Sequence, residues 1–411
     1  MKRILGKLVY FAVFVLPLVF LAVFYFSAKL PDVYFINEGE SKDFSFFPFS
    51  VTADRSCVQC SGTSQNVPEF YSATLKFMNL IPLKSVKVGV CESFFVTPCG
   101  LPFGVKLYTK GAVVVGTSSV AHAQGVAAPC NEAGIKKGDV IIAAGGKEIA
   151  GNDELEEIIQ LSGGEEIELK VLRENSEFTT HMRPLKSVQD GKYRVGIWVR
   201  DSSAGIGTLT FFSKQTKVFA GLGHGICDVD TAELLPLSRG EIVGAQITNV
   251  VRGSSGVPGE LKGCFKSLEP IGEICVNSET GLYGSLSAPL PIENEVKVTM
   301  KQNVKKGPAQ ILTTLEGETP ELYSVNIDSI NYDVTIPTKN MKITVTDQRL
   351  LAKTGGIVQG MSGSPILQNG NLVGAVTHVL VNNPARGFAI FAETMLTNSN
   401  NFLQSRYKNA S

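Results

Sequence analysis

The chain lacks an excess of either charge, because 38 lysines and arginines balance 38 aspartates and glutamates in 411 residues. Proteins that bind nucleic acid usually carry a basic face, so this balance gives no support for such a partner. Charged residues make up only 18% and apolar residues 44%, which argues against a disordered chain. No internal repeat or low-complexity tract is present. The composition indicates a folded protein, long enough for two or three domains.

Charge is missing altogether from residues 8–28, near the N-terminus. In a helix these 21 residues span roughly 31 Å, about the hydrocarbon thickness of a bilayer. Three basic residues precede them, which predicts that the N-terminus stays in the cytoplasm and the rest crosses. The alternative is a cleaved signal peptide, which normally has a shorter apolar core and a small residue where Phe26 stands. We expect a retained single-pass anchor.

Cysteines are few enough to count, and their roles stay open. The eight are Cys57, Cys60, Cys91, Cys99, Cys130, Cys227, Cys264 and Cys275. Their even number permits disulfides outside the cytoplasm, without fixing a pairing. A zinc site from the first four is an alternative, although the spacing of the second pair is wide for a zinc knuckle. Free thiols are the third possibility. We expect no metal and no cofactor.

The rest of the chain predicts a mainly β protein in three parts after an anchor at 1–29. Residues 30–95 mix short alternating runs with polar loops, which predicts a β-rich linking segment. Residues 96–186 predict strands around one helix at 152–161. Residues 187–411 are rich in glycine and in short alternating runs, which favours a closed barrel or paired barrels.

The second part resembles a PDZ domain of the bacterial, circularly permuted kind, most specifically at residues 133–141 (A-G-I-K-K-G-D-V-I). The resemblance implies a groove between a strand and the helix, where an extended peptide adds as an extra strand. Such domains present backbone amides to a peptide end at the position of residues 100–104. Phe103, Gly104 and Val105 are therefore the candidate peptide-binding residues. The alternative is a tight turn that packs Phe103 into the core.

A loop of small residues contains the candidate nucleophile. Residues 355–365 read G-G-I-V-Q-G-M-S-G-S-P. Tight turns use such residues, and so do loops that present a nucleophilic serine beside an oxyanion hole. A serine hydroxyl is a poor nucleophile until a base takes its proton, so Ser362 or Ser364 needs a histidine within reach. No H-E-x-x-H motif is present, which argues against a zinc protease.

Only four histidines could supply the base. His122 and His181 fall inside the PDZ-like part and are expected at its surface. His224 lies in a glycine-rich loop that leaves its imidazole accessible, so we expect it to be the base. His378 lies on an apolar strand, where a histidine more often belongs to the core or to the wall of a pocket. It is the second candidate for the base.

The third catalytic group should be a carboxylate that orients the imidazole and stabilises the imidazolium. Asp347 follows a strand and precedes a short helix, a position that equally suits a helix N-cap. Asp228 and Asp230 follow His224 closely and are rivals. Residue types leave the choice open, with Asp347 as the first candidate.

Three motifs together resemble the stage IV sporulation protein B peptidases of endospore-forming bacteria. They are F-A-G-L-G-H (219–224), T-G-G-I-V-Q-G-M-S-G-S-P-I (354–366) and G-A-V-T-H (374–378). The resemblance spans nearly the whole chain and also includes residues 204–211. It implies a serine peptidase with a chymotrypsin-like double β-barrel domain. Such an enzyme would be exported across the forespore membrane and act as a signal in the space between forespore and mother cell.

The resemblance also implies roles for individual residues. Gly360-Met-Ser-Gly-Ser-Pro365 is similar to the Gly-Asp-Ser-Gly-Gly-Pro loop of chymotrypsin-like proteases, which makes Ser362 the nucleophile. The backbone amides of Gly360 and Ser362 would form the oxyanion hole. Met361 replaces the aspartate of the trypsin group, so the zymogen-activating ion pair cannot form. Asp347 fits the His-Asp-Ser chain order of that fold, although it comes late in the chain.

The implied substrates are proteins. Resemblance to the family implies self-cleavage and cleavage of a membrane-bound regulator of an intramembrane metalloprotease, which then processes a sigma-factor precursor. One alternative is a general quality-control serine protease, which normally places its PDZ module after the protease domain. The other is a membrane-tethered PDZ receptor whose C-terminal domain only scaffolds.

Overall fold

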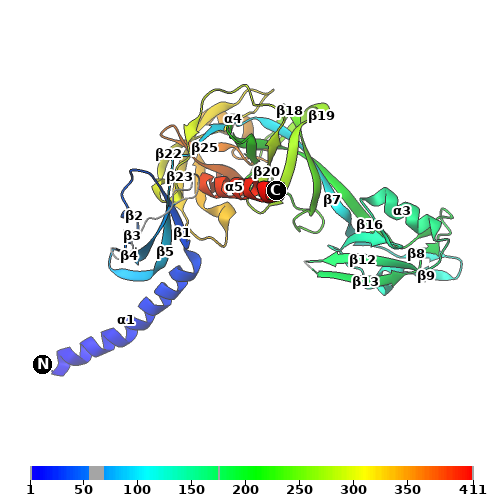
Figure 1. Cartoon of the computed structure of the whole chain (residues 1–411), viewed down its shortest axis with the longest axis horizontal. Coiled ribbons are helices and arrows are strands. Elements are labelled where there is room, and N and C mark those ends of the chain that lie inside the picture. Colours follow the sequence, from blue (N-terminus) through cyan, green and yellow to red (C-terminus); the bar gives the residue numbers. More distant parts are fainter. Residues whose placement is uncertain (1, 55–68, 175, 410–411) are drawn as a thin grey trace.

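The structure, a computed structural model, describes residues 2–54, 69–174 and 176–409 (Figure 1). It begins with helix α1 (Lys2–Lys29), which projects away from the rest of the molecule. Within the described residues, no helix combines the length and the apolar character needed to cross a membrane. The membrane anchor therefore stays a prediction. Cys57 and Cys60 of the zinc alternative lie outside the described residues.

Helix α1 leads into a five-stranded sheet with the order β1-β5-β4-β3-β2. Its strands are β1 (Val33–Asn37), β2 (Phe44–Phe46), β3 (Phe49–Ala53), β4 (Glu69–Phe77) and β5 (Ile81–Cys91). The apolar residues at alternate positions of these strands face one side, as period-two patterns predict. That side shares a continuous core with the C-terminal barrel, so the sheet is packed onto the body of the protein.

Two successive rings of strands form the body, and the first is closed by strand pairings between β7, β18, β19, β20, β17 and β16. Its strands are β7 (Pro102–Thr117), β16 (Ile197–Phe212), β17 (Val218–Gly221), β18 (Leu237–Val251), β19 (Glu260–Ser278) and β20 (Gly281–Leu286), with β6 (Phe95–Pro98) and β21 (Val296–Lys297) extending the sheet.

The second ring is a closed barrel with the order β22-β23-β24-β27-β26-β25. Its strands are β22 (Gly307–Thr313), β23 (Glu321–Ile330), β24 (Met341–Val345), β25 (Pro365–Gln368), β26 (Asn371–Val379) and β27 (Arg386–Phe391). Four short or terminal helices accompany it: η1 (Lys301–Asn303), η2 (Pro337–Lys339), α4 (Gln348–Thr354) and α5 (Ala392–Asn409). The predictions of a mainly β fold and of a closed barrel are confirmed.

The PDZ-like unit stands at the far side of the molecule from α1 (Figure 1). It contains β8 (Val120–His122), β9 (Gly125–Ala127), α2 (Pro129–Glu132), β10 (Val140–Ala144), β11 (Lys147–Glu148), α3 (Asn152–Leu161), β12 (Ile167–Arg173), β13 (Ser176–Met182), β14 (Leu185–Lys186) and β15 (Tyr193–Arg194). The predicted helix at 152–161 is present as α3.

Two long strands connect the PDZ-like unit to the first barrel. One half of β7 pairs within the barrel and the other half with β10 of the PDZ-like sheet, and β16 runs beside β7 over both halves. The first four residues of β16 therefore form the last strand of the PDZ-like sheet. Each of these two strands runs without a break from the first barrel into the PDZ-like sheet.

Candidate active site

The loop that carries Ser362 is held in place by two threonines of β16. The Thr208 hydroxyl donates to the Gly360 carbonyl, and the Thr210 hydroxyl donates to the Gly363 carbonyl, each at 2.7 Å. The Thr208 amide also donates to the carbonyl of Ser362 at 3.2 Å. These bonds tie the first barrel to the nucleophile loop of the second. Sequence alone does not assign this role to the two threonines, although their alternation in a strand places both side chains on one face of β16.

Two glycines of the loop cannot be replaced without moving backbone. Gly360 and Gly363 have φ of 92° and 94°, a region that L side chains rarely adopt. A Cβ atom at Gly363 would lie 2.0 Å from the carbonyl oxygen of Thr208. The small residues at these positions therefore allow the loop to lie close against β16.

The geometry also distinguishes the two serines. Ser364 is fully buried, and its hydroxyl donates to Thr313 Oγ1 at 2.9 Å. Ser362 is only partly buried and lines a cavity of about 510 Å³. Of the two, Ser362 is the serine that a substrate can reach.

Two backbone amides of this loop are available to a substrate. The amides of Met361, Gly363 and Ser364 donate to backbone carbonyls. In the described part of the chain, by contrast, no acceptor faces the amides of Gly360 and Ser362. Unpaired amides beside a nucleophile are the arrangement that stabilises an oxyanion. These are the two amides that the resemblance to chymotrypsin-like proteases implies for the oxyanion hole.

His224 lies in the loop after β17 and lines the same cavity as Ser362. Its Nδ1 atom lies 2.8 Å from the carbonyl oxygen of Gly225. A carbonyl only accepts, so a neutral ring carries its proton on Nδ1 and leaves the lone pair on Nε2. Burial lowers the pKa of His224, and the Gly225 carbonyl partly opposes this effect. The ring is therefore neutral near pH 7, as a general base must be.

His378 lies next to His224, with 5.2 Å between the ring centroids. Its side chain is exposed at the rim of the cavity. Partial burial lowers the pKa of His378 to about 4, and repulsion from the nearby His224 and Lys339 contributes to the same shift. The second histidine is therefore a neutral wall residue at physiological pH, within contact range of the expected base.

The Ser362 hydroxyl donates its proton to the carbonyl oxygen of Thr377 at 2.7 Å. Thr377 precedes His378 on β26, which forms one wall of the cavity. The hydroxyl proton must leave this carbonyl before His224 can accept it. A rotation of the Ser362 side chain is therefore the step that precedes attack.

In the described residues, none of the three candidate carboxylates is hydrogen-bonded to His224. Asp347 is the N-cap of α4, where its side chain accepts from the amides of Arg349 and Leu350 at 2.9 and 3.4 Å. It also forms an ion pair with the Arg349 guanidinium at 3.1 Å. These bonds lower the pKa of Asp347 and hold its carboxylate at the helix end. An aspartate between a strand and a helix is typical of an N-cap, and this is the role that Asp347 has in the structure.

Asp228 is also bonded elsewhere. Its carboxylate accepts from the amides of Asp230 and Thr231, both at 2.9 Å, and pairs with Arg200. Asp230 pairs with the same arginine at 2.9 Å. In the described residues, the hydrogen-bond partner of the His224 Nδ1 atom is the Gly225 carbonyl instead of a carboxylate.

The candidate peptide-binding residues lie in the first barrel and not at the PDZ-like groove. Phe103, Gly104 and Val105 belong to the part of β7 that pairs with β16 on one side and β18 on the other. Phe103 and Val105 are 1% and 2% exposed in the barrel core. A peptide cannot add to a strand whose two edges are occupied. The prediction that these residues bind peptide is therefore wrong, and Phe103 packs into the core instead.

The groove of the PDZ-like unit lies between α3 and the start of β16. A cavity of about 620 Å³ is lined there by α3 and by residues 195–199. Residues 197–200 pair with β7 along one edge, and α3 packs against the same end of β16. The groove therefore contains a strand with one edge available, which is the element that strand addition requires.

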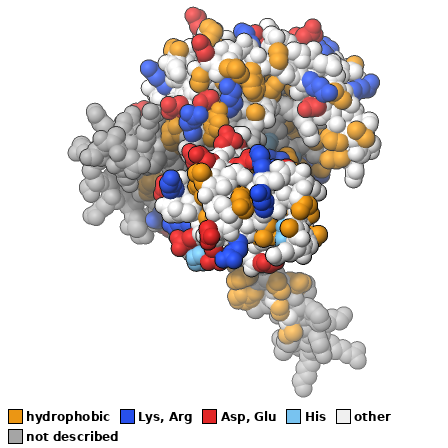
Figure 2. All heavy atoms as spheres, turned by 90° about the vertical axis from the view of Figure 1, so that its right-hand side faces the viewer, with side chains coloured by type: hydrophobic (Ala, Val, Ile, Leu, Met, Phe, Trp, Pro, Cys, Tyr) orange, Lys and Arg blue, Asp and Glu red, His pale blue; other side chains and the backbone are white. Residues whose placement is uncertain are grey.

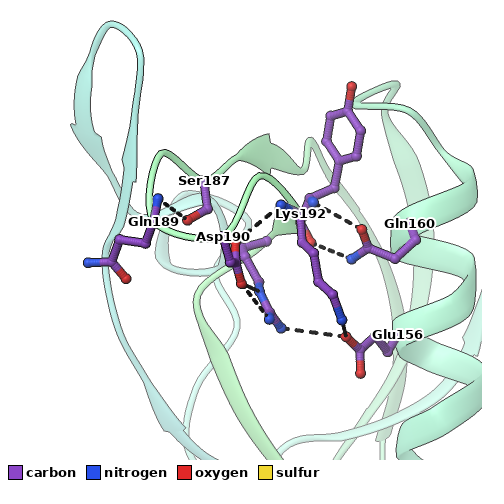
Figure 3. A network of polar contacts seen from close by, with 8 residues as sticks. Glu156, Gln160, Ser187, Gln189, Asp190 and Lys192 are labelled. Atoms are coloured by element: carbon purple, nitrogen blue, oxygen red, sulfur yellow. Dashed lines mark hydrogen bonds and ion pairs between the residues drawn. The ribbon is translucent and has the colours of Figure 1, made fainter.

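One end of this groove is closed by a polar network (Figure 3). The Gln160 side chain on α3 donates to the Tyr193 carbonyl at 2.7 Å and accepts from its amide at 3.1 Å. Lys192 and Arg194 form ion pairs with Glu156 at 3.3 and 3.6 Å. The segment before β16 is thereby fixed to the helix, which defines the width of the groove.

The cysteines give no support for a zinc site. Among the described residues, no group of three or more histidine, cysteine or acidic side chains could hold a metal ion. Cys91 and Cys99 are buried thiols. Burial raises the pKa of Cys91 to about 11, so this thiol is protonated at neutral pH.

Comparison with known proteins gives two family matches and matches to solved structures. The model of the SpoIVB peptidase S55 family matches residues 191–396, and that of the PDZ domain matches residues 104–182. No curated protein matches the chain. A solved structure, "Crystal structure of Rv3671c protease, inactive form", is 14% identical over 47% of this chain and 83% of that chain, with a TM-score of 0.27.

The first match covers half of the chain and includes every residue of the cavity that holds Ser362 and His224, apart from Val105. The PDZ match covers α3 and the sheet beside it. The chain belongs to the SpoIVB peptidase S55 family and is a serine peptidase with a PDZ domain.

Proposed function

We propose that this peptidase is a signalling endopeptidase of sporulation, which is anchored by its N-terminal helix and exported across the forespore membrane. It cleaves a membrane-bound regulator of an intramembrane metalloprotease, and it cleaves its own chain. The observation that supports the catalytic part is one cavity that contains Ser362, His224 and the unpaired amides of Gly360 and Ser362. Family membership supports the sporulation context.

The cavity supports an acyl-transfer mechanism. Ser362 rotates away from the Thr377 carbonyl, and His224 Nε2 takes the hydroxyl proton as the oxygen attacks the scissile carbonyl. The amides of Gly360 and Ser362 donate to the oxyanion, and one such donor is worth about 3 kcal/mol of transition-state stabilisation. The imidazolium gives its proton to the leaving amine, and an acyl-enzyme remains on Ser362. Water then attacks the ester and loses its proton to His224. The imidazolium returns this proton to the Ser362 oxygen as the acyl–oxygen bond breaks and the acid leaves.

A short segment supports substrates that lie close to the membrane. The Val334 amide donates to the Lys29 carbonyl at the end of α1, at 3.0 Å. Four residues later, the Thr338 carbonyl accepts from the Thr377 hydroxyl at the active site, at 2.6 Å. Four residues span at most about 14 Å. A cavity this close to the end of α1 suits juxtamembrane segments, including those of a membrane-bound regulator.

The PDZ groove is the proposed second contact with substrate. An extended peptide adds to the available edge of residues 197–200 and fills the cavity against α3. The same strand continues to Thr208 and Thr210, which hold the nucleophile loop. Peptide binding in the groove is thereby connected to the active site through one continuous strand.

Self-cleavage is tested with the full chain reconstituted in lipid vesicles. The parent chain should yield N-terminally shortened products over time, whereas Ser362→Ala should remain intact. Ser364→Ala serves as the matched control, because that hydroxyl is buried and bonded to Thr313. Equal shortening of the parent and of Ser362→Ala would remove self-cleavage from the proposed function.

A further inference from the structure

Two turns of the N-terminal sheet expose large apolar side chains at the same end. Phe47, in the β2–β3 turn, is 86% exposed, and Met78 and Leu80, in the β4–β5 turn, are 52% and 82% exposed. The turns lie side by side, because β3 and β4 pair up to Phe49 and Phe77. The Met78 amide also donates to the Pro48 carbonyl at 2.8 Å, which connects one turn to the other.

Helix α1 leaves the sheet at this same end (Figure 1). The Phe26 ring lies 5.3 Å from the ring of Phe49 and 5.6 Å from that of Phe77, measured between centroids. The Ser27 hydroxyl donates to the Leu83 carbonyl, near the start of β5, at 2.9 Å. The last turn of α1 is therefore fixed beside the two exposed turns.

A loop of the second barrel completes the surface. Val334 and Ile336 are 49% and 41% exposed, and the Val334 amide donates to the Lys29 carbonyl. Lys29 also forms an ion pair with the neighbouring Asp333 at 2.6 Å. Three loops, distant in sequence, thus gather around the base of one helix. The apolar collar consists of their exposed side chains: Phe47, Met78, Leu80, Val334 and Ile336.

The collar continues the apolar surface of α1. The helix exposes Leu18, Phe20, Leu21 and Phe24 by 66 to 78%. Hydrophobic side chains cover its described part where it projects below the body in Figure 2. Single exposed apolar residues are common on soluble proteins, but a contiguous group around an apolar helix marks an interaction surface.

We propose that the apolar collar inserts into the interfacial layer of the lipid bilayer around α1. This inference rests on the membrane anchor of the proposed function. Projecting turn tips suit a lipid surface, which needs no shaped partner, and the collar has the same chemistry as the helix it surrounds. Tyr25 and Lys29 occupy the end of the helix at the level of the collar, and both residue types are favoured at membrane interfaces.

The collar sets the orientation of the enzyme. A single helix lets the attached body rotate and tilt, whereas three additional contacts hold it against the bilayer. The segment from Val334 to Thr338 then places the active-site wall within about 14 Å of the collar. The PDZ domain, at the opposite side of the molecule, points away from α1 (Figure 1).

The single tryptophan of the chain allows a direct test. Trp198 lies in the PDZ domain and is 65% exposed, so the parent chain reports a site remote from the collar. All proteins in this test carry Ser362→Ala, which prevents self-cleavage. Phe47→Trp and Leu80→Trp are each made in the Trp198→Phe background of that full chain. The three proteins are reconstituted in phosphatidylcholine–phosphatidylglycerol vesicles whose acyl chains are brominated near the headgroup. Two tip variants guard against a local folding defect in one of them.

The collar predicts that brominated lipid quenches the tryptophan at position 47 and at position 80, with no loss of Trp198 fluorescence. Vesicle flotation, measured on the same samples, reports the anchor separately. If the chain floats and neither tip tryptophan is quenched, the proposal that the collar inserts is wrong, and the proposed membrane anchor is retained. If the chain does not float with the vesicles, the proposed membrane anchor is wrong, and so is insertion of the collar. Equal quenching of Trp198 would reveal general adsorption or self-association at the membrane and would also overturn the collar.

Discussion

The protonation state of His224 determines when the cavity contains a base. Burial lowers the pKa of this ring, and the Gly225 carbonyl directs its proton to Nδ1. At neutral pH, the lone pair on Nε2 is therefore available to the Ser362 hydroxyl without prior loss of a proton. His378 is neutral over the same pH range, so no positive charge on the second ring opposes formation of the imidazolium at pH 7.

The pH profile of peptide cleavage follows from this shift. Because the pKa of His224 lies below the ordinary value of 6.5, its ring remains neutral as pH falls through 6.5. We expect kcat/KM to stay level there and to decline only at lower pH, as the ring becomes protonated. A half-maximal point above 6.5 in the measured profile would show that the pocket favours the imidazolium instead.

The carboxylate assignment is tested by comparing two substitutions. Asp347→Ala should cost about 1 kcal/mol of unfolding free energy, because it removes a helix N-cap. Cleavage of a short peptide should persist in the folded fraction. His224→Ala should lower kcat by a factor on the order of 10⁴ to 10⁶. Comparable losses of kcat in both variants would restore Asp347 to the catalytic group.

At the scale of elements, strand β16 connects the two functional sites. Its first residues form the edge of the PDZ groove, and its last residues hold the nucleophile loop through Thr208 and Thr210. The strand pairs with β7 between residues 197 and 208 and with β17 between residues 209 and 212. We therefore expect a shift at the groove to move the nucleophile loop.

The Thr208 hydroxyl can be removed with little change of shape. Thr208→Val loses the bond to the Gly360 carbonyl, which we expect to lower kcat by about tenfold, a barrier change of roughly 1.4 kcal/mol. Thr208→Ser keeps the hydroxyl and should retain most of the rate. Steady-state kinetics on a short peptide measures kcat for both variants. An unchanged kcat in the valine variant would show that the loop keeps its conformation without the bond from the Thr208 hydroxyl.

The groove edge is tested at Trp198, whose side chain lines the groove and is largely exposed. Trp198→Ala should weaken the binding of a groove peptide by about tenfold, or roughly 1.4 kcal/mol. Cleavage of a short peptide that does not reach the groove should be unaffected. Fluorescence anisotropy of labelled peptides measures the binding. An unchanged affinity would place the peptide elsewhere on the PDZ domain.

The sequence predicted the elements that local residues specify. Glycines around His224 and Ser362 define the two loops of the cavity, and the helix at 152–161 follows from its own pattern. The neighbours of a strand are not visible in its own sequence. The alternation in residues 102–117 predicts β7, but it cannot show that its first half pairs within the barrel. The resemblance to PDZ domains therefore assigns Phe103 to the wrong unit. Asp347 suits both a catalytic carboxylate and a helix N-cap by its position in the sequence, and the structure shows that it caps α4.

At the scale of the whole molecule, the catalytic cavity lies between the helix end that we propose to be at the membrane and the PDZ groove. The second barrel contacts α1 through Val334, and the first barrel carries the PDZ domain on β7 and β16. Every part of this arrangement depends on Ser362 and His224 acting together.

Covalent labelling of the full chain with a fluorophosphonate tests that pairing most directly, because the reagent reacts with a serine only when a base activates it. The account predicts labelling of the parent at Ser362, its loss in Ser362→Ala and His224→Ala, and its retention in Asp347→Ala. Full labelling of a folded His224→Ala variant, or labelling of the parent at another residue, would contradict it.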